Sequence, residues 1–203
     1  MLKGYYFITD TGLSRAGNIS DVKNALAAGV TAVQYRNKQA STRQMCKEAI
    51  KLRSLCRRAL FLVNDRLDIA LVADADGVHL GSDDLPYRVA RKILGKKKII
   101  GMTVHNLKQA KEAQRLGADY IGVAPVFATK TKKDAGKPAG VRLIEEIHRQ
   151  VSIPIIAIGG IKLSNAAEVI KAGADGLCAI SAVVTKPDVK REIKKFQSLF
   201  LEQ

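Results

Sequence analysis

The sequence has few aromatic residues, no tryptophan, and three cysteines without a Cys-x-x-Cys pair. Aromatic residues make up 5% of the 203 residues. Proteins that bind single-stranded nucleic acids stack bases on aromatic side chains, so this composition disfavours such a role. Cys46, Cys56 and Cys178 stand in apolar or helical surroundings, which predicts reduced thiols and no zinc site.

Long apolar runs are absent as well. No run approaches the ~20 residues that a transmembrane helix needs, and the first strand-like run reaches Asp10 too early for a signal peptide. Apolar residues still make up 47% of the chain, which is typical of a globular protein. We therefore expect one cytoplasmic domain over residues 1–203 with no membrane partner.

Positive charge is abundant: 34 Lys and Arg stand against 19 Asp and Glu, a formal net charge of +15. Basic residues such as Arg43, Lys47 and Lys51 recur at helical spacing, which is typical of a solvated helix face. No nucleic-acid-binding motif accompanies them, so we expect a small anionic, phosphorylated substrate instead of nucleic acid. The sequence leaves the oligomeric state open, a homo-oligomer included.

Short apolar runs alternate with amphipathic stretches along the whole chain, which predicts repeated βα units. The expected strands are 5–9, 31–35, 60–64, 77–80, 99–103, 119–123, 154–158 and 176–180. The expected helices are 20–28, 42–58, 65–73, 85–94, 106–116, 141–150, 164–172 and 188–201, with Ser20, Ser41 and Asn106 as caps and Pro187 in a first turn. Eight such units favour a closed (β/α)8 TIM barrel over a doubly wound open sheet, which more often has five or six strands.

A short repeat of small residues and aspartate supports closure. It reads Ala28-Gly29-Val30-Thr31, Ala75-Asp76-Gly77-Val78, Gly117-Ala118-Asp119-Tyr120 and Gly173-Ala174-Asp175-Gly176. Each copy ends a predicted helix and precedes a predicted strand, so the repeat is two βα units long. The longest interval is the last, and it contains a polar, cationic loop over residues 129–133.

Polar residues follow most of the predicted strands. They include Thr9-Asp10, residues 34–38, Asn64-Asp65, residues 81–84, Thr103, the 129–133 loop, Gly159-Gly160 and Ser181. A parallel barrel brings the carboxyl ends of all its strands to one rim, where active sites of this fold lie. The sequence therefore predicts an enzyme with its site at that rim.

Two aspartates at this rim have the chemistry of Mg²⁺ ligands. Asp65 and Asp84 follow the third and fourth predicted strands, and Mg²⁺ commonly takes one or two carboxylates together with substrate phosphates. Each aspartate could equally cap the next helix, and spacing alone does not decide between a ligand and a cap. The neighbouring Asp83 is expected to be a surface residue.

Anion-binding groups lie elsewhere on the rim. Gln34, Arg36 and Lys38 alternate on an extended segment, so they are expected to face one pocket, where an arginine fork and a lysine suit a diphosphate. A charged strand exit facing water stays open as the alternative. Gly159-Gly160 and Ile180-Ser181 follow the last two strands, where many such barrels bind phosphate. The histidines show no ligand spacing; His79 and His148 are expected to be structural, and His105 receives no role.

Several blocks resemble the thiamine phosphate synthase family, also called thiamine-phosphate pyrophosphorylase. The most specific are residues 34–38 (Gln-Tyr-Arg-Asn-Lys), 64–66 (Asn-Asp-Arg), 77–81 (Gly-Val-His-Leu-Gly), 129–132 (Thr-Lys-Thr-Lys) and 157–161 (Ala-Ile-Gly-Gly-Ile). The likeness runs from Tyr6 to Ala182. It departs at Ser82, Thr103 and Ala128, where family members often have Gln, Ser and Pro.

The resemblance implies a Mg²⁺-dependent transferase that joins hydroxymethylpyrimidine diphosphate to a thiazole phosphate, or its carboxylated form, and releases pyrophosphate. It implies that the pyrimidine diphosphate is held by Gln34, Tyr35, Arg36, Asn37, Lys38, Asn64, Thr103 and Lys132. It also implies Mg²⁺ on Asp65 and Asp84, and thiazole phosphate on Thr129, Lys130, Thr131, Gly160, Ile180 and Ser181. Arg36, Lys38 and Lys132 would stabilise the leaving group while a pyrimidine cation forms. The alternatives are a thiazole tautomerase of the same superfamily and a non-catalytic anion or nucleic-acid binder.

Overall fold

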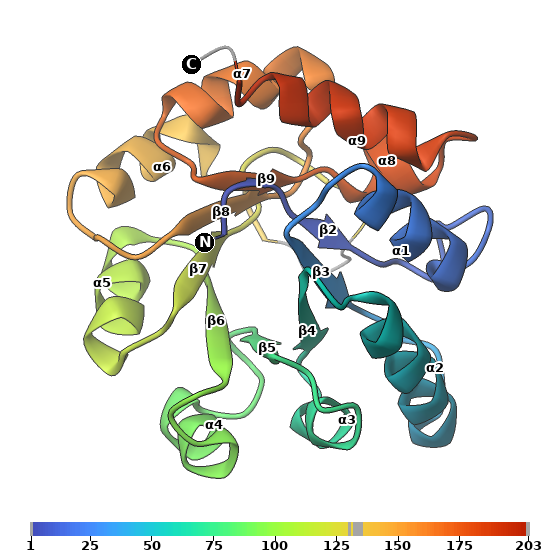
Figure 1. Ribbon diagram of the computed structural model, residues 1–203. Coiled ribbons are helices and arrows are strands. Elements are labelled where there is room, and N and C mark those ends of the chain that lie inside the picture. Colours follow the sequence, from blue (N-terminus) through green and yellow to red (C-terminus); the bar gives the residue numbers. More distant parts are fainter. Residues whose placement is uncertain (1, 130, 132–135, 202–203) are drawn as a thin grey trace.

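Within residues 2–129, 131 and 136–201, which the computed structural model describes, nine parallel strands form one sheet (Figure 1). The strands are β1 (Gly4–Tyr5), β2 (Phe7–Ile8), β3 (Ala32–Tyr35), β4 (Leu60–Asn64), β5 (Gly77–Leu80), β6 (Ile99–Val104), β7 (Tyr120–Val123), β8 (Ile155–Ile158) and β9 (Gly176–Cys178). Their order is β1-β9-β8-β7-β6-β5-β4-β3-β2. Only Tyr6 separates β1 from β2, so the two edges of the sheet meet in one segment and the sheet closes into a barrel.

Helices surround this barrel (Figure 1). They are α1 (Asn18–Ala27), α2 (Thr42–Leu55), α3 (Leu67–Val72), α4 (Tyr87–Leu94), α5 (Leu107–Leu116), α6 (Gly140–His148), α7 (Leu163–Lys171), α8 (Ile180–Val184) and α9 (Val189–Ser198). No helix among the described residues is long and apolar enough to cross a membrane. The closed parallel sheet and the helices that alternate with its strands confirm the predicted (β/α)8 TIM barrel.

Alternating side chains of the strands build two apolar layers. The larger layer fills the space between the sheet and the helices, and it includes Phe7, Val33 and Ile121. The smaller layer fills the barrel interior, and it includes Tyr6, Ile8, Leu62, Tyr120, Ile156 and Cys178. Because successive residues of a strand point to opposite faces, neighbouring residues such as Phe7 and Ile8 belong to different layers.

The repeated aspartates join neighbouring strands at the rim where the strands begin. Asp76 accepts a hydrogen bond from the backbone N–H of Phe61 at 2.8 Å, Asp119 from that of Ile100 at 2.8 Å, and Asp175 from that of Ile155 at 2.8 Å. Each bond connects the turn before one strand to the start of the strand beside it. The repeat therefore has a structural role, at the end of the barrel opposite the predicted site.

Some predicted boundaries were wrong. The first expected strand is interrupted at Tyr6, and the last one ends at Cys178 because the short helix α8 begins at Ile180. Ser41 and Asn106 cap α2 and α5 as predicted. Ser20, however, lies inside α1, whose cap is Gly17, and Pro187 precedes the cap of α9, Asp188.

Candidate active site

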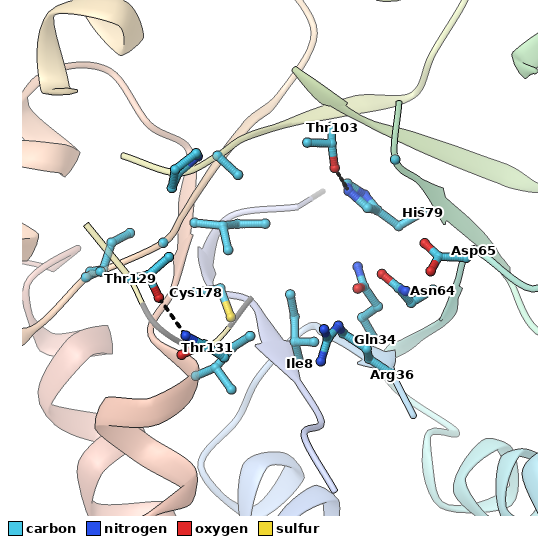
Figure 2. Close-up of a pocket in the computed structure, with 18 of the residues that line it drawn as sticks. Ile8, Gln34, Arg36, Asn64, Asp65, His79, Thr103, Thr129, Thr131 and Cys178 are labelled. Atoms are coloured by element: carbon cyan, nitrogen blue, oxygen red, sulfur yellow. Dashed lines mark hydrogen bonds between the residues drawn. The ribbon is translucent and has the colours of Figure 1, made fainter. Parts of the chain in front are cut away.

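A pocket opens at the rim where the strands end, and most of the predicted site residues line it. Twelve of them do so: Gln34, Arg36, Lys38, Asn64, Asp65, Asp84, Thr103, Thr129, Thr131, Gly160, Ile180 and Ser181. Figure 2 shows Asn64 and Asp65 on one side of the pocket and Thr129 and Thr131 on the opposite side. Lys130 and Lys132 lie outside the described residues. The pocket thus has an acidic and cationic side facing a hydroxyl-rich side.

Asp65 and Asp84 lie next to each other on the acidic side. Asp65 adopts a left-handed backbone with φ of 61°, which aspartate tolerates better than most residues. An oxygen of Asp84 accepts a hydrogen bond from the Gly81 backbone N–H at 2.6 Å. Burial and the adjacent Asp65 carboxyl raise the pKa of Asp84. Two carboxylates that disfavour each other's charge form a position suited to a cation.

Neither aspartate caps a helix. The caps of α3 and α4 are Arg66 and Pro86, and neither makes a side-chain capping bond. The described residues contain no group of three or more His, Cys, Asp or Glu able to hold a metal ion. Two carboxylates still fit Mg²⁺, because that ion commonly completes its shell with substrate phosphates and water.

Cationic side chains stand beside the carboxylates. The Lys38 ammonium pairs with an Asp65 carboxylate oxygen. Arg36 pairs with Asp10, whose Oδ2 lies 2.9 Å from its Nη1, and the Arg36 backbone N–H donates to the Thr9 hydroxyl at 2.8 Å. Asp10 was not among the predicted site residues. Its position directly after the first strand, at the rim where the site was expected, could have indicated its place. The pairing orients the guanidinium at the pocket wall.

Tyr35 and Asn37, which were expected to hold the pyrimidine diphosphate, do not line the pocket. Tyr35 points away from the barrel interior because it alternates with Gln34 and Arg36, and its hydroxyl donates to Glu48 at 2.6 Å. The Asn37 amide also donates to Glu48, at 3.2 Å, while its oxygen accepts two backbone N–H groups. Both residues brace the loop that carries Lys38.

The hydroxyl-rich side is built on two glycines with positive φ. Gly159 has φ of 100° and Gly160 has φ of 66°. A Cβ on Gly160 would lie 2.5 Å from the Ala128 carbonyl oxygen, and one on Gly159 would lie 2.7 Å from Pro125 Cβ. The backbone of Thr131 donates to the Thr129 hydroxyl at 3.2 Å. These glycines let two segments approach closely enough to enclose one end of the pocket.

The floor of the pocket contains residues that sequence reasoning missed. Ile8 and Cys178 line it, as does His79, which was expected to be only structural. His79 Nε2 lies 2.9 Å from the Thr103 hydroxyl (Figure 2). Alternation along β5 points His79 into the barrel, so its place in the strand was a usable signal.

Comparisons with known proteins agree on one family. The family model for thiamine monophosphate synthase matches residues 5–183. The chain is 52% identical over 199 residues to a thiamine-phosphate synthase of Methanosarcina mazei, covering 98% of this chain and 83% of that protein. It is 51% identical over 197 residues to the Chloroflexus aurantiacus thiamine-phosphate synthase, covering 96% and 91%.

A solved structure is similar throughout. Thiamine phosphate pyrophosphorylase from Pyrococcus furiosus superimposes with a TM-score of 0.90 at 43% identity, covering 98% of this chain and 96% of that one. The matched range includes every described residue of the pocket. The chain belongs to the thiamine monophosphate synthase family.

Proposed function

We propose that this protein joins hydroxymethylpyrimidine diphosphate to a thiazole phosphate, or its carboxylated form, and releases thiamine phosphate and pyrophosphate. The observation that carries the proposal is the two-sided pocket. One side has a pair of carboxylates beside cationic side chains, and the opposite side has hydroxyl groups and two glycines. A reaction between a diphosphate and a monophosphate needs two separate anion sites. Membership of the family supports the same reaction.

The diphosphate belongs on the side of Asp65 and Asp84. Mg²⁺ held by these two carboxylates would neutralise charge on the departing pyrophosphate. Lys38 moves from Asp65 toward the phosphate oxygens when they arrive, because its side chain is 56% exposed and can change partner. Arg36 offers a fork that its pairing with Asp10 has already oriented. Lys132 is assigned to the same leaving group by family resemblance.

The monophosphate belongs on the opposite side. Thr129 and Thr131 provide hydroxyls, and the backbone around Gly160 and Ser181 can approach phosphate oxygens closely. Lys130 adds a positive charge by resemblance. The two substrates then meet over the floor formed by Gln34, Thr103 and Ile180.

The chemistry needs no side-chain nucleophile. The C–O bond to the diphosphate breaks first, and its electrons leave with pyrophosphate. The thiazole nitrogen then attacks the resulting pyrimidine methylene cation, forming the C–N bond. The protein's part is to stabilise charge on the leaving group and to exclude water, which would otherwise trap the cation. Arg36 and Lys38 serve the first purpose, joined by Lys132 on the family resemblance, and the apolar lining residues Ile8, Ile158 and Ile180 serve the second.

The test is to incubate the protein with Mg²⁺ and each substrate alone, then with both. We expect thiamine phosphate only in the complete mixture. Isomerisation of the thiazole phosphate without joining would assign the protein to the tautomerase reaction. No change in either substrate would leave the pocket as an anion-binding site without this activity.

A further inference from the structure

A chain of hydrogen bonds runs through the barrel interior below the pocket floor. The Gln34 amide nitrogen lies 3.0 Å from the Tyr6 hydroxyl, which lies 2.8 Å from the Tyr120 hydroxyl. Tyr120 lies 2.8 Å from Nδ1 of His79, and Nε2 of His79 lies 2.9 Å from the Thr103 hydroxyl. Gln34, His79 and Thr103 line the pocket, whereas Tyr6 and Tyr120 do not. The chain therefore begins and ends at the pocket and passes beneath it.

The barrel interior is built to hold this chain. Tyr6, Gln34, His79 and Tyr120 are each at most 4% exposed. A Cβ on Gly101 would lie 2.1 Å from the Tyr120 ring, and one on Gly122 would lie 3.0 Å from the His79 ring. Barrel interiors are usually filled by branched apolar side chains. Here two glycines leave room for rings that carry polar groups, and such groups are costly to bury unless every one is bonded.

With the Gln34 amide nitrogen facing Tyr6, as the structure places it, the hydrogen bonds run in one direction. The Gln34 nitrogen is a donor, so the Tyr6 hydroxyl accepts from it. Among the hydrogen bonds of the described residues, Tyr120 is then the acceptor for the Tyr6 proton, and Nδ1 of His79 is the acceptor for the Tyr120 proton. Burial raises the pKa of both tyrosines, so both keep their protons at neutral pH. With the Gln34 nitrogen facing Tyr6, a neutral His79 carries its proton on Nε2 and donates it to Thr103.

This direction fixes what the two ends present to a ligand. The Thr103 hydroxyl accepts from His79, so its own proton is directed to another acceptor. The Gln34 amide is held by its nitrogen, and its oxygen has no hydrogen bond within the described part of the chain. The floor therefore offers an acceptor at Gln34 and a hydroxyl donor at Thr103. An aminopyrimidine ring complements it, with an amino donor and ring-nitrogen acceptors.

We propose that Tyr6 and Tyr120 are positioning residues, which act through Gln34 and His79 to set the donor and acceptor pattern that recognises the aminopyrimidine ring. This inference rests on the proposed function for the identity of the ligand. The two tyrosines contact no substrate themselves. They select the amide orientation of Gln34 and the tautomer of His79, and thereby the side-chain atoms that the ring meets.

The first test reads the tautomer directly and needs no activity. Long-range ¹H–¹⁵N spectra of histidine-labelled protein distinguish a ring protonated on Nε2 from one protonated on Nδ1. The chain has three histidines, so His105→Gln and His148→Gln variants assign the His79 signals by elimination. We expect the Nε2–H tautomer in the wild type and a mixture in Tyr120→Phe. A wild-type ring protonated on Nδ1 would overturn the proposal.

The second test measures discrimination between the pyrimidine diphosphate and an analogue with an oxo group replacing the amino group. We expect Tyr6→Phe and Tyr120→Phe each to lower kcat/KM for the natural substrate at least tenfold. The ratio of kcat/KM for the natural substrate to kcat/KM for the oxo analogue should also fall at least tenfold. The KM for thiazole phosphate should stay within twofold. Tyr87→Phe is the matched control, because its buried hydroxyl bonds to the Gly117 carbonyl, away from the pocket.

The outcomes separate this inference from the proposed function. If the wild type forms no thiamine phosphate, the proposed function fails, while the tautomer spectra still decide the direction of the chain. If the wild type is active but both tyrosine variants keep its discrimination, the positioning roles are refuted. A loss of discrimination that Tyr87→Phe shares equally would also refute them, because it would reflect stability alone.

Discussion

Lys38 and Asp65 form an ion pair at the rim of the pocket, where β3 and β4 end. The carboxylate that is proposed to hold Mg²⁺ is therefore already next to a cation. Asp84 lies next to Asp65, and its pKa is raised by burial and by that neighbour. An arriving diphosphate with Mg²⁺ would exchange partners with this group, Lys38 turning to phosphate and Asp65 to the metal. The Asp65 carboxylate and the Lys38 ammonium would thus each have a partner of opposite charge both before and after the diphosphate binds.

Replacing Asp65 with Asn should weaken the use of Mg²⁺. We expect the Mg²⁺ concentration for half-maximal activity to rise more than about tenfold, the factor given by a loss of about 1.4 kcal/mol. A Mg²⁺ titration of the rate measures it. Asp68→Asn is the control, because Asp68 is an exposed carboxylate paired with Arg66. Equal Mg²⁺ dependence in the two variants would remove Asp65 from the metal site.

Replacing Lys132 with Ala should lower turnover more than it raises the KM. Charge stabilisation of a leaving group acts in the transition state, and loss of one such interaction costs about 10²–10³ in kcat. Steady-state kinetics of the variant measures the effect, with Lys137→Ala, an exposed lysine later in the same chain segment, as the control. An unchanged kcat with a raised KM would show that Lys132 acts in ground-state binding only.

Gly160→Ala should damage the monophosphate side of the pocket. The added Cβ would lie 2.5 Å from the Ala128 carbonyl oxygen, at a backbone with φ of 66°. We expect the KM for thiazole phosphate to rise at least about tenfold, or about 1.4 kcal/mol in binding. Gly95→Ala also places alanine at a positive φ, 72°, but with no atom within 4 Å of the added Cβ. The KM of Gly95→Ala for thiazole phosphate should be unchanged, although its free energy of unfolding falls.

Asp21→Asn should stabilise the protein at neutral pH. Asp21 is 1% exposed, neither carboxylate oxygen meets the geometry of a hydrogen bond to a described residue, and burial raises its pKa more than the nearby Ser14 hydroxyl lowers it. Because the pKa of Asp21 is higher in the folded than in the unfolded protein, protonation of Asp21 stabilises the fold. This stabilisation is complete below the unfolded-state pKa of about 3.9. It is lost as the pH rises through the folded-state pKa of Asp21. The free energy of unfolding should therefore fall across this window in the wild type.

The variant should lose this part of the pH dependence and gain about 1 kcal/mol at pH 7, the scale of an unsatisfied buried group. Chemical denaturation at several pH values measures both quantities. Asp83→Asn removes an exposed carboxylate and should leave the dependence as it is. A variant that is less stable than the wild type at pH 7 would show that Asp21 has a stabilising partner.

The alternation of apolar and amphipathic segments predicted the barrel, since each βα unit repeats one local pattern. It did not predict the break at Tyr6 or the helix α8, because both depend on how the ends of the barrel close. The pocket residues at strand ends were predictable because topology alone brings them together. Tyr35 lies outside the pocket because it alternates with Gln34 and Arg36 along its strand. Tyr120 was missed because its role appears only when Tyr6 and His79 meet across the barrel.

The most direct test of the proposed function follows pyrophosphate and thiamine phosphate together, with both substrates and Mg²⁺ present. We predict that the two products appear in a one-to-one ratio, and that both disappear when EDTA is added or when Asp65 is replaced by Ala. Pyrophosphate without thiamine phosphate would mean that the protein hydrolyses the diphosphate, and formation of neither product would contradict the proposed reaction.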